Sequence, residues 1–186
     1  MSIVAKTEEV SKAIEVLALG EHKTKKLDDL TYISNFDENI LTEVQKIISL
    51  HLSEPYSIYT YRYFLIKWPN LCIACMEDSK LIGSIICKEE MANNRKEGYI
   101  GMLAVDEKHR GKGIGSELVS KAIEKMREMK CDEVVLETEV TNLAAIALYT
   151  RFGFIKVQKL FRYYLNGGDA FRLKLYLTDP LSCKRR

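Results

Sequence analysis

Apolar side chains recur every three to four positions in several parts of the chain. This spacing is typical of helices that bury one side against a core. It is clearest in Ile40, Val44, Ile47, Ile48 and Leu52. The pattern predicts helices over Asn39–Leu52, Ile58–Trp68, Gly113–Met129 and Leu143–Phe152. In the second helix, Phe64 and Trp68 are expected in the core.

Shorter apolar or alternating runs predict strands between these helices. They are Leu30–Phe36, Leu71–Met76, Leu81–Glu89, Gly98–Val105, Glu133–Val140, Phe154–Leu165 and Ala170–Leu177. The second, third and fourth runs are expected to form an antiparallel meander. The later strand-helix-strand-helix order requires locally parallel strands. Asn166-Gly167-Gly168-Asp169 predicts a hairpin between the last two runs. The fold class is therefore mixed α/β.

Residues 1–27 differ from the rest of the chain. An apolar stripe at helical spacing is followed by a charged run, Gly20–Lys26, without apolar anchors. We expect an N-terminal extension that is partly helical or disordered, serving as a linker or as a docking helix. One domain over 28–178 and a basic tail over 179–186 complete the organisation.

Composition narrows the function classes. The chain has 186 residues, 47% hydrophobic and 29% charged, with a net charge of +2. These values indicate one globular domain and argue against nucleic-acid binding through bulk charge. There is no secretory signal and no apolar run near the ~20 residues of a membrane span. Together with an odd number of cysteines, 5, this predicts a cytoplasmic or nuclear protein with free thiols.

Cys72 and Cys75 form a C-x-x-C pair inside a predicted strand. Residues three apart on a strand point to opposite faces. No second pair and no nearby histidine pair completes a zinc site. We therefore expect buried thiols and no metal.

Glycines cluster in Arg110-Gly111-Lys112-Gly113-Ile114-Gly115, between a predicted strand and a long helix. Glycines allow close backbone approach, and a helix N-terminus attracts phosphate. The spacing fits neither a Walker A loop nor G-x-G-x-x-G. The segment predicts a phosphate-binding loop of another kind.

Arg110-x-x-Gly113-x-Gly115 resembles the acetyl-coenzyme A loop of the GNAT acetyltransferases. Gly101–Val105 and Asn142-x-x-Ala145-x-x-Leu148-Tyr149 resemble two further elements of that family. The resemblance implies the GNAT fold, a mixed and mostly antiparallel sheet flanked by helices, with splayed strands forming the acetyl-CoA cleft. It implies acetyl-CoA contacts from Leu103, Ala104, Val105, Arg110, Gly111, Lys112, Gly113, Gly115, Ser116, Asn142 and Tyr149.

Within the GNAT enzymes, segments from about Leu41 to Leu177 resemble the family of NatC catalytic subunits. They include Gly98–Val105, Leu136–Val140 and Phe161–Asn166. The resemblance implies acetylation of the α-amino group of N-terminal Met followed by a bulky apolar residue. It also implies auxiliary subunits and ribosome proximity in the cytoplasm. Substrate contacts are expected from Leu52, Glu54, Tyr56, Met102, Glu139, Tyr163 and Tyr164.

Glu137 and Glu139 lie on one face of a predicted internal strand. Buried unpaired charges are costly, so a cleft with water or a cationic substrate explains them better than packing does. Glu137 is the candidate base, because an α-amine titrates near ~7.7–8.0 and a modest base is sufficient. Glu139 is equally compatible with pairing to a basic neighbour.

The resemblance places the phenol of Tyr149 beside the thioester sulfur, where it would protonate the departing thiolate. The alternative for Tyr149 is a core aromatic. The backbone amide near Leu103 is expected to polarise the thioester carbonyl. Direct transfer in a ternary complex follows, without an acyl-enzyme.

Two other functions remain alternatives. One is a GNAT enzyme that acts on lysine side chains or a small amine, which would need stronger deprotonation at a pKa near ~10.4. The other is a GNAT scaffold that binds the cofactor without catalysis.

Overall fold

The computed structural model describes residues 30–51 and 56–179. The expected extension over 1–27, the contacts of Leu52 and Glu54, and the tail over 180–186 lie outside these residues. The described residues form seven strands, four α-helices and two short 3-10 helices. In chain order these are β1 (Leu30–Ser34), α2 (Glu38–His51), α3 (Ile58–Lys67), η2 (Pro69–Leu71), β2 (Cys72–Glu77), β3 (Lys80–Ala92), β4 (Arg95–Val105), η3 (Glu107–His109), α4 (Ile114–Glu128), β5 (Glu133–Glu139), α5 (Leu143–Arg151), β6 (Ile155–Leu160) and β7 (Ala170–Tyr176).

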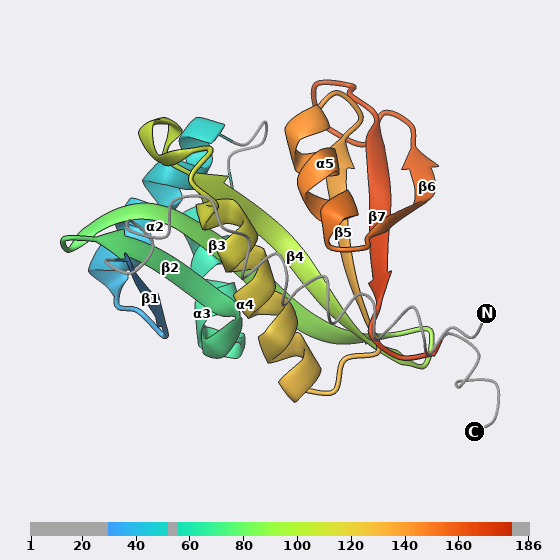
Figure 1. Ribbon diagram of the computed structural model, residues 1–186, viewed down its shortest axis with the longest axis horizontal. Coiled ribbons are helices and arrows are strands. Elements are labelled where there is room, and N and C mark those ends of the chain that lie inside the picture. The colour runs from blue at the N-terminus through green and yellow to red at the C-terminus, as the bar shows by residue number, and fades with distance from the viewer. Residues whose placement is uncertain (1–29, 52–55, 180–186) are drawn as a thin grey trace. The chain divides into compact units, whose positions relative to one another are not determined.

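The strands are hydrogen-bonded in the order β1-β2-β3-β4-β5-β7-β6 (Figure 1). The pairs β1/β2, β2/β3, β5/β7 and β6/β7 are antiparallel, and β4/β5 is parallel. This confirms the mixed α/β class with a mostly antiparallel sheet. It also confirms the parallel pair that the strand-helix-strand order requires.

The chain contacts divide the described residues into two compact units. The α4 unit comprises residues 30–51, 56–88 and 100–125. The α5 unit comprises residues 89–99 and 126–179. Strands β3 and β4 contribute residues to both units.

In the α4 unit, helices cover both faces of the strands. One face packs against α2 and α3 through a core that includes Val44, Ile48 and Phe64. The other face meets α4, where a Cβ placed at Gly83 would lie 3.4 Å from side-chain atoms of Ile114 and Leu118. Figure 1 shows α3 behind these strands and α4 in front of them. The apolar stripes predicted for α2 and α4 supply these contacts.

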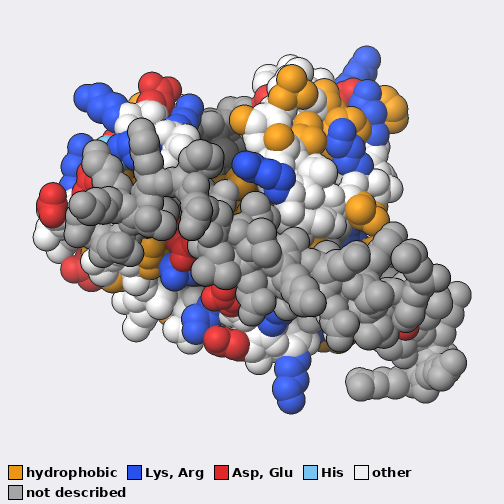
Figure 2. All heavy atoms as spheres, viewed as in Figure 1, with side chains coloured by type: hydrophobic (Ala, Val, Ile, Leu, Met, Phe, Trp, Pro, Cys, Tyr) orange, Lys and Arg blue, Asp and Glu red, His pale blue; other side chains and the backbone are white. Residues whose placement is uncertain are grey.

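In the α5 unit, β5 pairs with β4 through Glu97–Tyr99 and with β7 along its whole length. Strand β6 lies at the edge, and it exposes Ile155 and Val157 beside Lys156 and Lys159. Figure 2 shows hydrophobic and basic side chains together on the surface formed by α5 and β6. Lysines on an edge strand oppose pairing with a further strand.

Three predicted strand ends were wrong by three residues or more. Strands β3 and β4 extend to Ala92 and Arg95, because Asn93 and Asn94 form a two-residue turn with φ of 51° and 59°. Asparagine tolerates this left-handed conformation better than most residues. Strands β6 and β7 form the predicted antiparallel hairpin, but β6 ends at Leu160, so residues 161–169 connect the two strands.

Candidate functional site

The glycine-rich segment connects β4 and η3 to α4 in the α4 unit. Gly111 and Gly113 have φ of 74° and 87°, a conformation that favours glycine. No heavy atom lies within 4 Å of a Cβ placed at either residue. The first amides of α4 have no acceptor in the preceding turn, and a helix N-terminus favours an anion. The segment therefore has the open backbone surface and the polarity that a phosphate group requires.

Arg110 is attached to the strand that precedes this loop. Its Nε donates a hydrogen bond to the carbonyl oxygen of Val105 at 3.1 Å. Lys112 is exposed within the loop. The loop thus carries two basic side chains in addition to its amides.

His109 anchors the same loop through a contact that the sequence analysis missed. Its Nδ1 lies 2.9 Å from Oδ2 of Asp106, and its Nε2 lies 3.1 Å from Oε2 of Glu77. The contact with Asp106 lowers the pKa of that carboxyl, although partial burial opposes this. Since Glu77 lies in β2, no local motif around His109 could have revealed the pairing.

Strand β4 alternates its side chains between a buried and a half-buried face. Met102 and Ala104 belong to the core shared with α2 and α3. Leu103 and Val105 are half-buried. The side chain of Met102, a predicted substrate contact, is therefore part of the core. Leu103 is expected to act through its backbone amide.

Aromatic residues of α3 divide between core and surface. Phe64 is buried and Trp68 packs against the core, as expected. Tyr61 is also buried, which the sequence analysis did not predict. Tyr63 and Tyr56 remain exposed. Of the predicted substrate residues near this helix, only Tyr56 lies among the described residues.

Glu137 is held in the α5 unit by groups from two neighbouring strands. The Tyr99 hydroxyl donates a hydrogen bond to its Oε2 at 2.9 Å. An Arg172 nitrogen, NH1, lies 3.3 Å from its Oε1. The Glu137 side chain is 6% exposed. Both carboxylate oxygens therefore have a partner, and the basic neighbour considered for Glu139 is found at Glu137.

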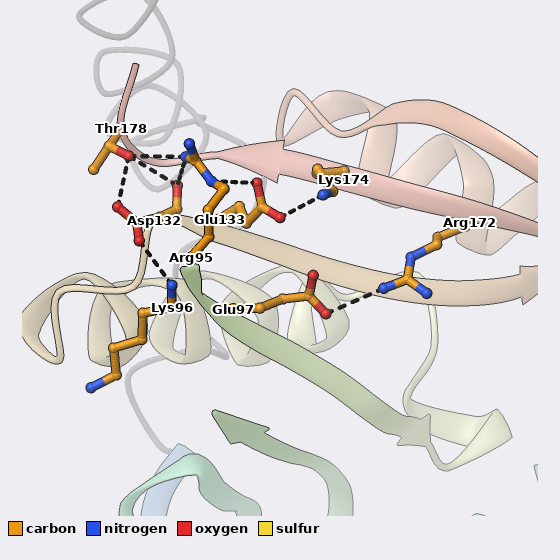
Figure 3. Close-up of polar contacts among 8 residues, drawn as sticks. All are labelled: Arg95, Lys96, Glu97, Asp132, Glu133, Arg172, Lys174 and Thr178. Atoms are coloured by element: carbon orange, nitrogen blue, oxygen red, sulfur yellow. Dashed lines mark hydrogen bonds and ion pairs between the residues drawn. The ribbon is translucent and has the colours of Figure 1, made fainter. Parts of the chain in front are cut away.

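Arg172 also contacts a second buried carboxylate. Its NH2 lies 3.3 Å from Oε1 of Glu97, whose side chain is 5% exposed (Figure 3). Burial raises the pKa of Glu97, and the charges of Arg172 and Lys174 oppose this rise. Arg172 faces Glu137 in the ladder between β5 and β7. One guanidinium thus joins two carboxylates from β4 and β5.

The face of β4, β5 and β7 that carries Glu97, Glu137 and Arg172, called here the polar face, is also charged near the start of β5. Lys174 binds Glu133, and Nε of Arg95 lies 2.9 Å from Oε2 of Glu133. Figure 3 shows Lys174 and Arg95 converging on this carboxylate from two strands. The sequence analysis missed these charges because the pairing depends on strand register.

Glu139 lies at the end of β5, beside the connection between β6 and β7. A surface hollow of about 320 Å³ is lined there by Glu139, Val140, Thr141, Asn166, Gly167, Gly168 and Asp169. The Thr141 hydroxyl donates a hydrogen bond to Glu139 at 3.3 Å. Tyr163 and Tyr164 in the connection pack edge to face, with ring centroids 5.1 Å apart. These three predicted substrate residues therefore flank one polar hollow or its adjoining loop.

Asn142 and Tyr149 belong to α5. Asn142 caps this helix, since its side chain accepts a hydrogen bond from the Ala145 amide at 3.1 Å. Tyr149 is 4% exposed, and its ring lies 5.4 Å from that of Phe154. Tyr149 thus has the packing of a core aromatic, and its proposed role depends on its hydroxyl.

The described predicted residues fall into two sets. Tyr56, Met102–Val105 and Arg110–Ser116 belong to the α4 unit. The α5 unit contains Glu137, Glu139, Asn142, Tyr149, Tyr163 and Tyr164. Each set is assembled from segments that are distant in sequence.

The thiols have the placement that the strand pattern predicts. Cys72, Cys75, Cys87 and Cys131 are buried and free. Burial raises the pKa of Cys72 to about 12 and that of Cys131 to about 11. Within residues 30–51 and 56–179, no group of three or more His, Cys, Asp or Glu residues could hold a metal ion. In the same part of the chain, no helix is long and apolar enough to cross a membrane.

Residues 41–154 match the family model described as the acetyltransferase (GNAT) family. The chain is 52% identical over 163 residues to N-alpha-acetyltransferase 30 of Xenopus laevis, covering 86% of this chain and 60% of that protein. It is 50% identical over 155 residues to N-alpha-acetyltransferase 30 of Saccharomyces cerevisiae, covering 80% and 88%. The chain spans between 42% and 60% of the length of its vertebrate relatives.

A solved structure has a similar fold. It is the crystal structure of the NatC complex bound to Gag peptide and CoA, with a TM-score of 0.77 and 48% sequence identity. The match covers 81% of this chain and 99% of that chain.

Proposed function

The chain belongs to the GNAT acetyltransferase family, and on this premise we propose that it is a protein N-terminal acetyltransferase of NatC type. It transfers an acetyl group from acetyl-CoA to the α-amino group of Met followed by a bulky apolar residue. The observation that carries the proposal is the buried Glu137 carboxylate, held on both oxygens, in a family member with an open glycine loop. Similarity to the NatC structure with peptide and CoA supports the same substrates.

The glycine loop fits the phosphates of acetyl-CoA. Loop amides and basic side chains would hold the pyrophosphate. They belong to Arg110, Gly111, Lys112, Gly113, Gly115 and Ser116. The positive φ of Gly111 and Gly113, and the open space beside them, support this fit. Backbone groups of Leu103–Val105, together with Asn142, would complete the binding. Acetyl-CoA supplies the acetyl group as a thioester.

The protein groups move two protons in this reaction. Glu137, directly or through water, takes a proton from the substrate amine, so that its nitrogen lone pair can form the new C–N bond. As the C–S bond breaks, Tyr149 gives its proton to the departing sulfur, and the second proton of the attacking nitrogen passes through water to the tyrosinate, which leaves a neutral amide. The Leu103 amide stabilises negative charge on the acetyl oxygen. The peptide would be bound by Leu52, Glu54, Tyr56, Met102, Glu139, Tyr163 and Tyr164.

A peptide panel that varies residue two tests this function. Purified chain, acetyl-CoA and mass detection should give acetylation of Met-Leu, Met-Ile and Met-Phe starts. Rates on Met-Gly or Met-Asp starts should be lower, because an apolar pocket discriminates by ~1–3 kcal/mol per methylene-scale change. Equal rates on internal lysines would favour the lysine acetyltransferase instead. CoA binding without turnover on any peptide would leave only a scaffold.

The same proposal includes partners and location. The likeness to a chain of the NatC complex supports auxiliary subunits, and NatC-type substrates suit a cytoplasmic enzyme near the ribosome. Residues 1–27 are a candidate docking arm because of their apolar stripe. Co-purification with the auxiliary subunits should decrease when 1–27 are deleted. Unchanged co-purification would remove the arm from this role.

A further inference from the structure

We propose that Arg172 is a positioning residue for Glu137, and that Glu97 is the second carboxylate that holds Arg172 in place. This inference rests on the proposed function, because it concerns the base of that reaction. It assigns a role to two residues that no sequence motif singled out.

Arg172 contacts both carboxylates from its position on β7. Arg172 lies opposite Glu137 in the β5/β7 ladder and contacts its Oε1 at 3.3 Å. The second guanidinium nitrogen contacts Glu97 on β4 at 3.3 Å. A planar guanidinium with rigidly placed donors, held at two points, has little freedom to rotate. Arg172 therefore directs Glu137, while the other carboxylate oxygen accepts the hydrogen bond from Tyr99.

The two carboxylates that contact Arg172 are both buried. The Glu97 and Glu137 side chains are only 5% and 6% exposed, and both contact the same arginine. Other ionisable groups of this polar face are Glu133 and Glu139 on β5, Arg95 and Tyr99 on β4, Lys174 on β7 and Glu90 on β3. Lys174 is engaged by Glu133. Arg172 thus contacts both Glu97 and Glu137, and Lys174 adds a weaker favourable charge at Glu97.

Removing Arg172 would leave two carboxylates buried without that cation. Lys174 would remain near Glu97, but with less neutralising charge the carboxylates of this face favour uptake of a proton by one of them. A protonated Glu137 cannot accept a proton from the substrate. Arg172 therefore holds Glu137 as the carboxylate that the reaction requires.

The experiment measures kcat/KM against pH on a Met-Leu peptide for five proteins. They are the wild type, Arg172→Met, Glu97→Gln, the Glu97→Gln/Arg172→Met double variant, and Arg62→Met as a matched exposed control. Arg172→Met should move the acid limb upward by about one pH unit or more, with a roughly tenfold loss near pH 7. The double variant should move the limb back, because only one carboxylate remains. Glu97→Gln alone should move it downward, and Arg62→Met should not move it.

An acid limb that stays in place in Arg172→Met would overturn the inference, since a purely structural arginine changes stability without changing this limb. Should Arg172→Met fail to fold, Glu97→Gln decides, and an unmoved acid limb in that variant overturns the proposal. A second readout is independent of turnover: ¹³C NMR titration of glutamate Cδ, with the Glu137 signal assigned from Glu137→Gln. Its midpoint should rise in Arg172→Met, and an unchanged midpoint also overturns the inference. Absence of acetylation by the wild type would defeat the proposed function alone, because the titration would still report on Arg172.

Discussion

The two units bury their strands with different chemistry. In the α4 unit, both faces of the strands are covered by apolar side chains such as Ile48, Phe64 and Leu118. In the α5 unit, one face of β5 carries Glu133 and Glu137, and cations from β7 contact both. Apolar burial is a large favourable contribution to folding, whereas buried ion pairs contribute little net stability. The comparison indicates that the apolar faces maintain the fold, whereas the charged face of β5 contributes little net stability.

The largest expected effect is the loss of activity in Glu137→Gln. The substitution keeps the side-chain shape and removes the base, so kcat should decrease by ~10²–10⁴-fold. Steady-state kinetics on a Met-Leu peptide measure this, and urea unfolding should show a folded protein. Glu43→Gln, an exposed carboxylate on α2, is the matched control. A kcat within a factor of three of wild type would remove Glu137 from the role of base.

In Leu118→Ala, a substitution in α4, stability is expected to decrease and activity is not. Leu118 has no exposed surface, and its loss should lower the free energy of unfolding by about 2–5 kcal/mol. Urea unfolding followed by circular dichroism measures this. Activity per folded molecule should change far less than in Glu137→Gln. Glu128→Ala, exposed on the same helix, should cost much less, and a loss in Leu118→Ala no larger than that in Glu128→Ala would contradict the assignment of Leu118 to the core.

A smaller effect is expected from the buried thiol of Cys72 at alkaline pH. Its pKa is raised by burial to about 12, against a usual value of 9.0. The unfolded chain loses this proton first, so the thiol stabilises the folded state fully below pH 9 and progressively less up to about 12. The slope is up to about 1.4 kcal/mol per pH unit. Cys72→Ala should therefore show a shallower decrease in the urea midpoint between pH 8 and 10, and an identical decrease would contradict the burial of Cys72.

The smallest effect is expected for the exposed ion pair between Arg62 and Glu38, which joins α3 to α2. Exposed pairs are screened by water and salt, so Arg62→Ala should leave the urea midpoint nearly unchanged. Arg172→Ala, which leaves two buried carboxylates without their cation, should lower it measurably. A larger loss in Arg62→Ala than in Arg172→Ala would reverse the comparison between exposed and buried charges.

Local patterns accounted for most of the fold. Helical apolar spacing located α2 through α5 to within a residue or two, since the buried side of a helix must recur with its turn. The errors arose at strand ends. The charged runs Lys88–Glu90 and Arg95–Glu97 lie on either side of the Asn93-Asn94 turn, so the apolar pattern stopped before the strands did. The connection over 161–169 contains aromatic residues that continued the strand pattern past its end.

The residues of the candidate site were predictable in part for the same reason. The glycine loop and the strand carrying Glu137 are short contiguous segments with recognisable side chains. The contacts of Glu137 with Tyr99 and Arg172 were not predictable. These partners lie 38 and 35 positions from Glu137 in the sequence. His109 was missed similarly, since its partner Glu77 lies on another strand.

The sequence by itself determined the helices, most of the strands, the glycine loop and the presence of two carboxylates on one face of β5. These features depend on side-chain periodicity and on the backbone freedom of glycine, which are local properties. Only the tertiary structure decided that Arg172 joins Glu137 to Glu97 and that His109 anchors the loop. Strand order and register bring such residues together, and both depend on the packing of the whole sheet.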